Sequence, residues 1–129
     1  MVIDTSAIIA ILFNEPDALE MARAIEAGAV RRISAATLLE AAIVIEIRHG
    51  IAGGEKPDQL LRLANVQIEP VTAEQVAIAR LAFRLYGKGR HPARLNYGDC
   101  FAYALAKAVG EPLLFKGNDF VHTDVGTVT

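Results

Sequence analysis

The amino-acid sequence predicts an α/β fold, with a mostly parallel β-sheet and helices on both of its faces. Short apolar runs typical of buried strands alternate with longer segments of helical periodicity along the whole chain. Glycine or proline marks most junctions between them. With 129 residues, of which 53% are hydrophobic, the chain can bury one sizeable core, so we expect a single domain over residues 1–129.

Four short apolar runs have the length and composition of strands. They are MVID (1–4), RRISA (31–35), VQIEPV (66–71) and EPLLF (111–115), and a weak fifth strand is expected near TVT (127–129). Because helical segments separate them, the strands should run parallel, with the first and the fourth central in the sheet. Functional sites in such sheets form outside the carboxyl ends of the strands.

Helices are predicted over residues 6–13, 16–27, 36–49, 57–64, 73–86 and 97–109. Their ends carry recognisable signals. Pro16 suits a first helical turn, Gly50 stops a helix, and Asn96 suits an N-cap. The segments 51–57 (IAGGEKP) and 87–95 contain glycine and proline and are expected to be loops.

Four carboxylates fall where such a sheet would bring them to one edge: Asp4, Glu40, Asp99 and Asp119. Asp4 ends the first strand, and Asp119 follows the fourth. Glu40 and Asp99 lie in the opening turns of helices that can lean toward the same edge. Together these acids would repel one another and raise each other's pKa unless a cation neutralised them.

Each acid also has an ordinary structural explanation. Asp4 could cap the following helix, and Asp119 could be a turn residue. Asp99 could be the acidic partner of a capping box with Asn96 as its N-cap, because the helix dipole favours an anion there. Glu40 is harder to explain in this way, because it sits among apolar residues where an unpaired carboxylate is costly to bury.

The residue types indicate which cation such a site would hold. His49, His91 and His122 are not spaced as a zinc site and are expected at the surface, and the single Cys100 is expected in the core. An all-oxygen set of ligands suits Mg²⁺, with Mn²⁺ able to substitute. An ion of this kind can activate water for phosphodiester hydrolysis and stabilise charge on the phosphate.

A basic segment interrupts a chain whose net charge is -2. No acid occurs between Gln75 and Gly98, whereas this segment holds five of the thirteen lysines and arginines. They are Arg80, Arg84, Lys88, Arg90 and Arg94. They could form a solvated face or follow the phosphates of a nucleic acid. Discounting the four site acids gives -2 + 4 = +2, so the net charge does not exclude an RNA partner.

Other features concern the compartment and the partners. No apolar run approaches the about 20 residues of a membrane helix, and no signal peptide is evident, so we expect a cytoplasmic protein. The high apolar content favours a homodimer, with AIIAILF (7–13) and AAIVIEI (41–47) as partner surfaces. Tyr97 is a candidate for stacking on bases, whereas Tyr103 suits the core.

Four segments together make the chain resemble a known family. They are MVIDTSAIIAIL (1–12), ATLLEAAIVIE (36–46), RHPARLNYGDCFAYALAKA (90–108) and PLLFKGNDF (112–120). With them the chain resembles a PIN-domain ribonuclease, specifically a VapC-type toxin of a bacterial toxin–antitoxin pair. The resemblance implies a three-layer α/β/α sandwich around a parallel sheet of four or five strands. It also implies a homodimer and a VapB-type antitoxin whose C-terminal segment blocks the site.

The resemblance assigns roles to individual residues. The four acids correspond to the family's catalytic and metal-binding acids, with Asp4 and Asp99 as the metal ligands. Ser6 takes the place of a hydroxyl that hydrogen-bonds a site carboxylate. Around the fourth acid either Asn118 or Asp119 could face the metal. The implied activity is that of a Mg²⁺-dependent endoribonuclease that uses metal-activated water and binds RNA through the five basic residues named above.

Two other interpretations are open. A receiver-like signalling domain has a similar length and clustered acids, but no aspartate occurs between Asp17 and Asp58 to serve as its phosphoacceptor. A PIN-like fold kept as a binding module with little catalysis is the second. The presence of all four acids counts against that second interpretation.

Overall fold

The computed structural model describes residues 1–89 and 91–128. The strands are β1 (Val2–Ile3), β2 (Arg32–Ser34), β3 (Gln67–Glu69) and β4 (Leu113–Leu114). The helices are α1 (Thr5–Leu12), α2 (Ala18–Ala27), α3 (Ala35–His49), the 3-10 helix η1 (Ile51–Glu55), α4 (Lys56–Leu63), α5 (Ala73–Tyr86) and α6 (Tyr97–Val109).

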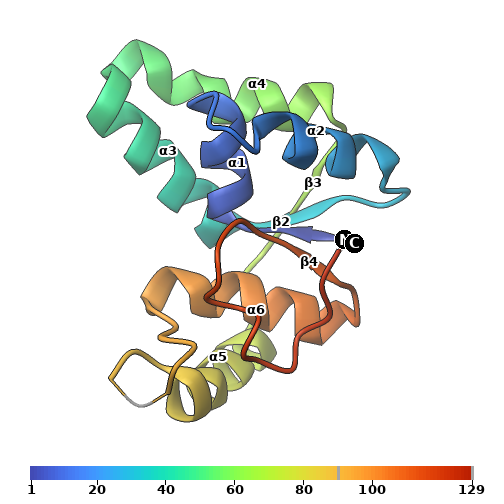
Figure 1. The fold of residues 1–129 in the computed structure, drawn as a ribbon, viewed down its shortest axis with the longest axis vertical. Helices are drawn as coiled ribbons and strands as arrows, with labels where there is room; N and C mark the ends of the chain where they lie inside the picture. The colour runs from blue at the N-terminus through green and yellow to red at the C-terminus, as the bar shows by residue number, and fades with distance from the viewer. Residues whose placement is uncertain (90, 129) are drawn as a thin grey trace.

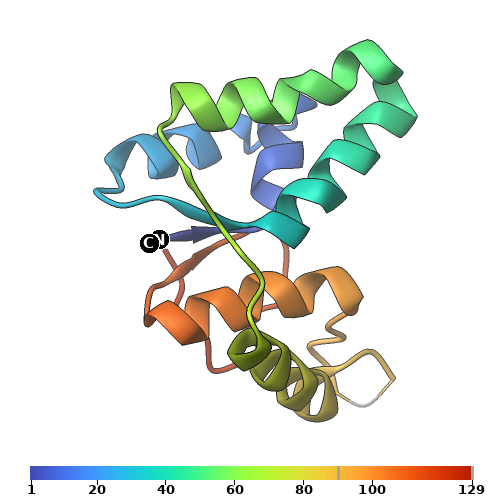
Figure 2. The ribbon, with the colours of Figure 1, turned by 180° about the vertical axis from the view of Figure 1, so that it is seen from behind.

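Helices cover both faces of the sheet, so the chain forms three layers (Figure 1). One face carries α1, α2, α3 and α4, and the other carries α5 and α6, as the view from behind also shows (Figure 2). This confirms the predicted α/β/α sandwich. Among residues 1–89 and 91–128, no helix combines the length and the apolar character that crossing a bilayer requires.

The strands lie in the order β3-β2-β1-β4, and every neighbouring pair is parallel. The prediction that β4 is central is therefore wrong. It is an edge strand because the described residues after it, 115–128, form turns and one isolated bridge rather than a further strand. It still pairs with β1, and the Asp4 amide donates to the Leu114 carbonyl at 2.9 Å. Asp4 therefore emerges beside the end of β4.

Two apolar cores lie on opposite faces of the sheet. Val2 and Leu113 belong to the core beneath α5 and α6, whereas Ile3 and Leu114 belong to the core beneath α1, α2 and α4. Successive side chains of a strand point to opposite faces, so each two-residue strand serves both layers. Even these very short strands therefore fix the position of helices on both sides.

Side-chain caps begin the helices at the carboxyl edge of the sheet. Asp4, Ser34 and Thr72 each accept a hydrogen bond from a backbone amide in the first turn of α1, α3 and α5. Such caps satisfy amides that have no partner within the helix. The strand-to-helix junctions therefore place polar side chains along one edge of the sheet.

Pro16 stands outside α2, so its predicted place in the first helical turn is wrong. The Ala18 amide donates to the Glu15 carbonyl at 2.9 Å, which closes a turn with Pro16 as its second residue. Proline is common at the second position of a turn because its fixed φ matches the backbone conformation needed there. The residue marks the turn before the helix rather than the helix itself.

Two predictions about loops and strands are also corrected. The expected loop at residues 51–57 is mostly η1, which begins after Gly50 breaks α3 with a φ of 78° and leads directly into α4. The expected fifth strand is a single bridge from Thr127 to β4. Thr129, the last residue of that expected strand, lies outside the described residues.

Truncation of the buried side chain of Ile33 in β2 should destabilise the fold. Ile33→Ala leaves a cavity in the core beneath α1, α2 and α4, so we expect a loss of about 2–5 kcal/mol in the free energy of unfolding, measured by urea denaturation. Leu63→Ala is the control, because Leu63 is 88% exposed and should change stability by less than about 0.5 kcal/mol. Equal effects of the two changes would contradict the assigned core.

Candidate functional site

Asp4 lies at the carboxyl edge of the sheet, where β1 meets the first turn of α1. Its side chain is only 4% exposed. Its Oδ2 accepts hydrogen bonds from the Ser6 amide at 3.0 Å and from the Ser6 hydroxyl at 2.6 Å. The pKa of Asp4 is raised to about 6, chiefly by burial and also by the charge of Glu40, against the lowering effect of the Ser6 hydrogen bonds.

Ser6 joins Asp4 to the segment that follows β4. Its hydroxyl oxygen accepts a hydrogen bond from the Lys116 amide at 2.9 Å. The Lys116 ammonium in turn pairs with Glu15 at 2.8 Å and Asp17 at 3.1 Å, in the turn between α1 and α2. The chain after β4 is thereby fastened to the start of the molecule.

Asp99 lies in the first turn of α6 and is 9% exposed. Its Oδ2 accepts a hydrogen bond from the backbone N–H of Asn96 at 3.0 Å, and the side-chain Oδ1 of Asn96 accepts one from the backbone N–H of Asp99 at 2.9 Å. The two residues therefore form a capping box. The pKa of Asp99 is raised to about 7, chiefly by burial and also by the charges of Asp4, Asp119 and Glu40. Asp99 is therefore a cap and also a member of the acidic cluster.

Glu40 reaches the cluster from the second turn of α3. Its Oε1 accepts a hydrogen bond from the Thr5 hydroxyl at 2.5 Å. Its Oε2 lies against Gly98, where an added Cβ would stand 1.9 Å from that oxygen. Thr5 therefore holds this carboxylate, and the absence of a side chain at Gly98 leaves room for it. Sequence reasoning missed both residues, and only their places beside Asp4 and Asp99 could have indicated them.

Asp119 and Asn118 stand at the outer side of the cluster. Both are exposed, in the segment after β4. Asp119 is close enough for its charge to raise the pKa of Asp99. The structure thus brings all four predicted acids to one edge, with Asp4 and Asp99 buried, Glu40 half-buried and Asp119 open to solvent.

The cluster is not a closed metal cage. Within residues 1–89 and 91–128, no group of three or more His, Cys, Asp or Glu side chains is arranged to enclose a metal ion. Thr5 and the Asn96 amide hold Glu40 and Asp99 in hydrogen bonds instead. Mg²⁺ keeps several waters and needs only one or two carboxylates, so the buried and mutually repelling pair Asp4 and Asp99 fits that ion.

The thiol, the buried tyrosine hydroxyl and the histidine side chains that the sequence offered as other candidate groups do not belong to the acidic cluster. Burial raises the pKa of the Cys100 thiol to about 11, so it is not a reactive thiolate at neutral pH. Tyr103 is 5% exposed, and its hydroxyl donates to Asp124. His49 and His122 are exposed, and His91 is partly exposed, with its Nδ1 accepting a hydrogen bond from the Ala93 backbone N–H.

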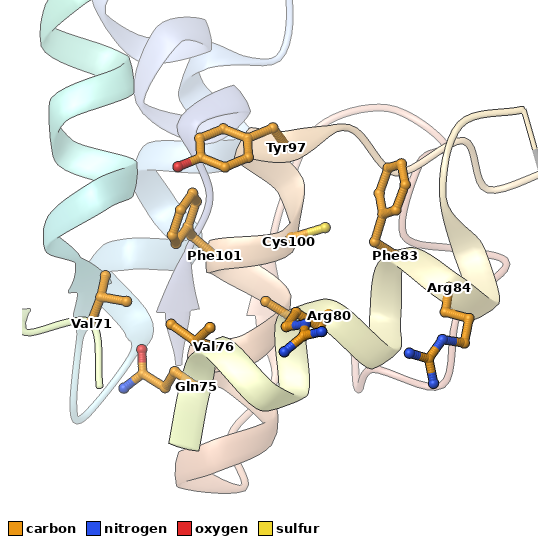
Figure 3. Close-up of a pocket in the computed structure, with 10 residues that line it drawn as sticks. Val71, Gln75, Val76, Arg80, Phe83, Arg84, Tyr97, Cys100 and Phe101 are labelled. Carbon is orange, nitrogen blue, oxygen red and sulfur yellow. The ribbon is translucent and has the colours of Figure 1, made fainter. Parts of the chain in front are cut away.

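A groove of about 610 Å³ runs between α5 and the start of α6 (Figure 3). The residues that line it from α5 include Arg80, Phe83 and Arg84, and those from α6 are Tyr97, Cys100 and Phe101. Cys100 follows Asp99 directly, so the groove and the acidic cluster share the first turn of α6. The sequence alone gave no sign of this groove.

The predicted basic residues fall into three positions. Arg80 and Arg84 line the groove. Lys88 and Arg94 are exposed in the segment between α5 and α6, and Arg94 adopts a left-handed backbone with a φ of 55°. Arg90 lies outside the described residues. The structure therefore places part of the basic segment beside the acidic cluster.

The class of this protein follows from its fold and from the acids at the carboxyl edge. Residues 1–126 match the family described as PIN domain. VapC ribonuclease Mb0640 of Mycobacterium bovis is 56% identical over 128 residues, which cover 99% of this chain and 98% of that protein. The chain therefore belongs to the PIN-domain family and, within it, to the VapC ribonucleases. This assignment replaces the receiver-like interpretation.

Two solved structures share the fold. The crystal structure of Mycobacterium tuberculosis VapC20, a toxin that cleaves the sarcin-ricin loop, aligns with a TM-score of 0.78 at 20% identity, over 96% of this chain and 95% of that one. A toxin–antitoxin complex from Klebsiella pneumoniae aligns with a TM-score of 0.71 at 19% identity, over 99% and 95%. Because both identities are this low, these two structures show a shared fold and nothing about shared function.

Removal of the Asp4 charge should stabilise the metal-free protein at high pH. Because the pKa of Asp4 is raised from 3.8 to about 6, the stability linked to its neutral form is lost as the pH rises through about 6. We expect Asp4→Asn in EDTA to raise the free energy of unfolding at pH 8 by roughly 1–3 kcal/mol and to change it little at pH 4. Urea denaturation at both pH values measures this.

Asp124→Asn is the matched control, because it should change the free energy of unfolding at pH 8 in the opposite direction. The hydrogen bond from Tyr103 is the main cause that lowers the pKa of Asp124, so its charge stabilises the fold above its unfolded pKa and that stability is lost at low pH. The substitution should destabilise the protein at pH 8. If Asp4→Asn also destabilises at pH 8, Asp4 does not carry an unfavourable charge in the folded state.

Gly98→Ala should displace Glu40 without unfolding the protein. The added Cβ needs the space of the Glu40 carboxylate, which is the far end of a flexible side chain and can rotate away from Thr5. Because alanine is a better helix former than glycine, stability should stay within about 1 kcal/mol of the parent. A crystal structure that shows the Thr5–Glu40 hydrogen bond intact in this variant would contradict the assigned role of Gly98.

Proposed function

We propose that this chain is a divalent-metal-dependent endoribonuclease, the toxin of a toxin–antitoxin pair, formed as a single nuclease domain over residues 1–129. The observation that carries the proposal is the pair of buried, mutually repelling carboxylates, Asp4 and Asp99, in a chain 56% identical to a VapC ribonuclease. A cation between them would offset both the burial that chiefly raises the pKa of Asp99 and the repulsion from Asp4 that adds to it.

Each acid takes a distinct part in this proposal. Asp4 and Asp99 hold Mg²⁺, with Mn²⁺ as a substitute, and Glu40 and Asp119 complete the catalytic acids. The hydrogen bond from the Asn96 backbone N–H to Asp99 Oδ2 orients this carboxylate and leaves it lone pairs with which it would hold the cation. Held there, a divalent ion would supply Lewis-acid chemistry, namely a lowered pKa of water and stabilisation of charge on the scissile phosphate.

The surrounding residues hold these acids in place. Ser6 donates to Asp4 and so fixes the rotation of that carboxylate. Thr5 holds Glu40 at the edge of the cluster by donating a hydrogen bond to its carboxylate. Asn118 precedes Asp119 in the exposed segment after β4, and either of the two could face the metal.

The RNA substrate would lie across the basic segment beside the cluster. We propose that the exposed side chains of Arg80, Arg84, Lys88 and Arg94 contact its phosphates, together with Arg90, which lies outside the described residues. None of the four described residues forms an ion pair with another described residue. Their charges are therefore available to an anionic partner.

The partners are an antitoxin of the VapB type and a second copy of the chain. A structural neighbour is a toxin–antitoxin complex. On α3 the apolar side chains of Leu39, Ile43 and Ile47 are 60%, 47% and 81% exposed, which favours a protein partner there. In α1, by contrast, Ala7 and Ile8 are buried, so that helix offers less surface than expected. The lone Cys100 is consistent with a cytoplasmic location.

Cleavage of RNA should depend on a divalent cation and on the buried acids. The purified protein is expected to cut single-stranded RNA in Mg²⁺ or Mn²⁺, to lose activity in EDTA, and to leave 5′-phosphate and 3′-hydroxyl ends. Asp4→Asn and Asp99→Asn should each lower the cleavage rate by on the order of 100-fold or more, because each removes a ligand charge while keeping the hydrogen bonds of the caps.

Two outcomes would contradict this function. Activity that survives EDTA or both substitutions would exclude the assigned site. A wild-type protein that binds Mg²⁺ in calorimetry but does not cut RNA would support the interpretation as a binding module. Glu74→Gln, in the first turn of α5 and exposed, is the control, because it removes an acid outside the cluster and should leave the rate unchanged.

A further inference from the structure

The groove between α5 and α6 exposes aromatic rings to solvent. Tyr97 is 80% exposed and Phe83 is 39% exposed. The ring of Tyr97 meets that of Phe101 edge to face, with centroids 4.9 Å apart. Figure 3 shows these two rings projecting from α6 above the residues of α5. An aromatic surface held in this way offers a flat ring a place to stack.

The charges around the groove favour an anionic partner. Arg80 and Arg84 line it, and no acidic residue does so among the described part of the chain. Arginines beside exposed aromatic rings form the combination that binds single-stranded nucleic acids, because the rings stack on bases while the guanidinium groups contact phosphates. An apolar peptide would use the rings but would leave both arginines without a counter-charge.

The position of the groove connects it to the acidic cluster. Asp99 and Cys100 are neighbours in α6, and successive side chains of a helix diverge by about 100°. One therefore faces the cluster and the other faces the groove. A strand whose phosphate lies at Asp99 would pass over Tyr97 at the start of α6. A volume of about 610 Å³ is within the usual range for a small-ligand pocket.

We propose that this groove is a base-binding subsite for single-stranded RNA. One nucleobase next to the scissile phosphate stacks on Tyr97, and Arg80 and Arg84 contact the adjoining phosphates. The inference rests on the proposed ribonuclease function, because it concerns the same substrate. It gives Tyr97 a role in binding, separate from the role of the acids in cleavage.

Binding measured in EDTA separates this subsite from the metal and from cleavage. The probes are a short fluorescein-labelled oligoadenylate and an abasic oligonucleotide with the same ribose-phosphate backbone, titrated with the full chain and followed by fluorescence anisotropy. The variants are Tyr97→Ala, Tyr97→Phe, and Leu81→Ala as the control. Leu81 is a 52% exposed apolar residue of α5 that does not line the groove.

Tyr97→Ala should weaken binding of oligoadenylate by roughly 5- to 100-fold and leave binding of the abasic probe within about 2-fold. Tyr97→Phe and Leu81→Ala should bind both probes as the wild type does. Arg84→Ala should weaken both probes and reduce the salt dependence, because it removes a phosphate contact. The chain contains no tryptophan, so quenching of tyrosine fluorescence by oligoadenylate in the wild type and its loss in Tyr97→Phe give a second readout.

Two results would overturn the inference. One is that Tyr97→Ala weakens both probes equally or neither. The other is that it leaves RNA binding intact but changes the sedimentation coefficient of the protein alone, which would make the groove a contact between protein chains. Base-dependent binding through Tyr97 without cleavage in Mg²⁺ would instead support the subsite and refute the ribonuclease function, so the two failures are distinguishable.

Discussion

The burial of two carboxylates, Asp4 and Asp99, at one edge of the sheet is the constraint on which the organisation of the acidic cluster depends. Asp4 and Asp99 are both nearly inaccessible, so burial makes the ionised form of each costly, and the charge of Asp4 adds to that cost for Asp99. A fold that gathers such charges must hold them by other means. Here the amides at the starts of α1 and α6 donate to the two side chains, and the partial positive charge of helix N-termini acts in the same direction.

The same atoms therefore serve stability and chemistry. The capping box that begins α6 uses the carboxylate that also belongs to the acidic cluster, and the N-cap of α1 does the same with Asp4. These two roles are compatible because a carboxylate has two oxygens and several lone pairs. Substitution by asparagine separates the roles, since it keeps an acceptor for the cap and removes the charge. Glu40 differs, because a hydroxyl and a glycine hold it rather than a helix terminus.

Much of this arrangement could be predicted from the sequence, because strands and helices alternate regularly and the acids follow strand ends. Other parts depended on packing between distant segments. The contact of Glu40 with Gly98 requires α3 and α6 to meet, and nothing local in either helix indicates it. The order of strands was likewise not readable from their lengths, so β4 was wrongly placed at the centre. The capping box was one explanation offered for Asp99, and the hydrogen bond from the Asn96 backbone N–H to Asp99 Oδ2 confirms it, but its place in the acidic cluster depends on the packing of α6 against the sheet.

The fastening of the segment after β4 to α1 also has a consequence during synthesis on the ribosome. A nascent chain that has emerged only as far as α5 already contains Asp4 and Glu40. It still lacks α6, the Leu114 carbonyl that accepts from the Asp4 amide, and the Lys116 amide that donates to Ser6. Its first acids then have neither their partner carboxylate nor their full set of restraints. The growing chain thus remains without a formed acidic cluster until nearly all of it has been translated.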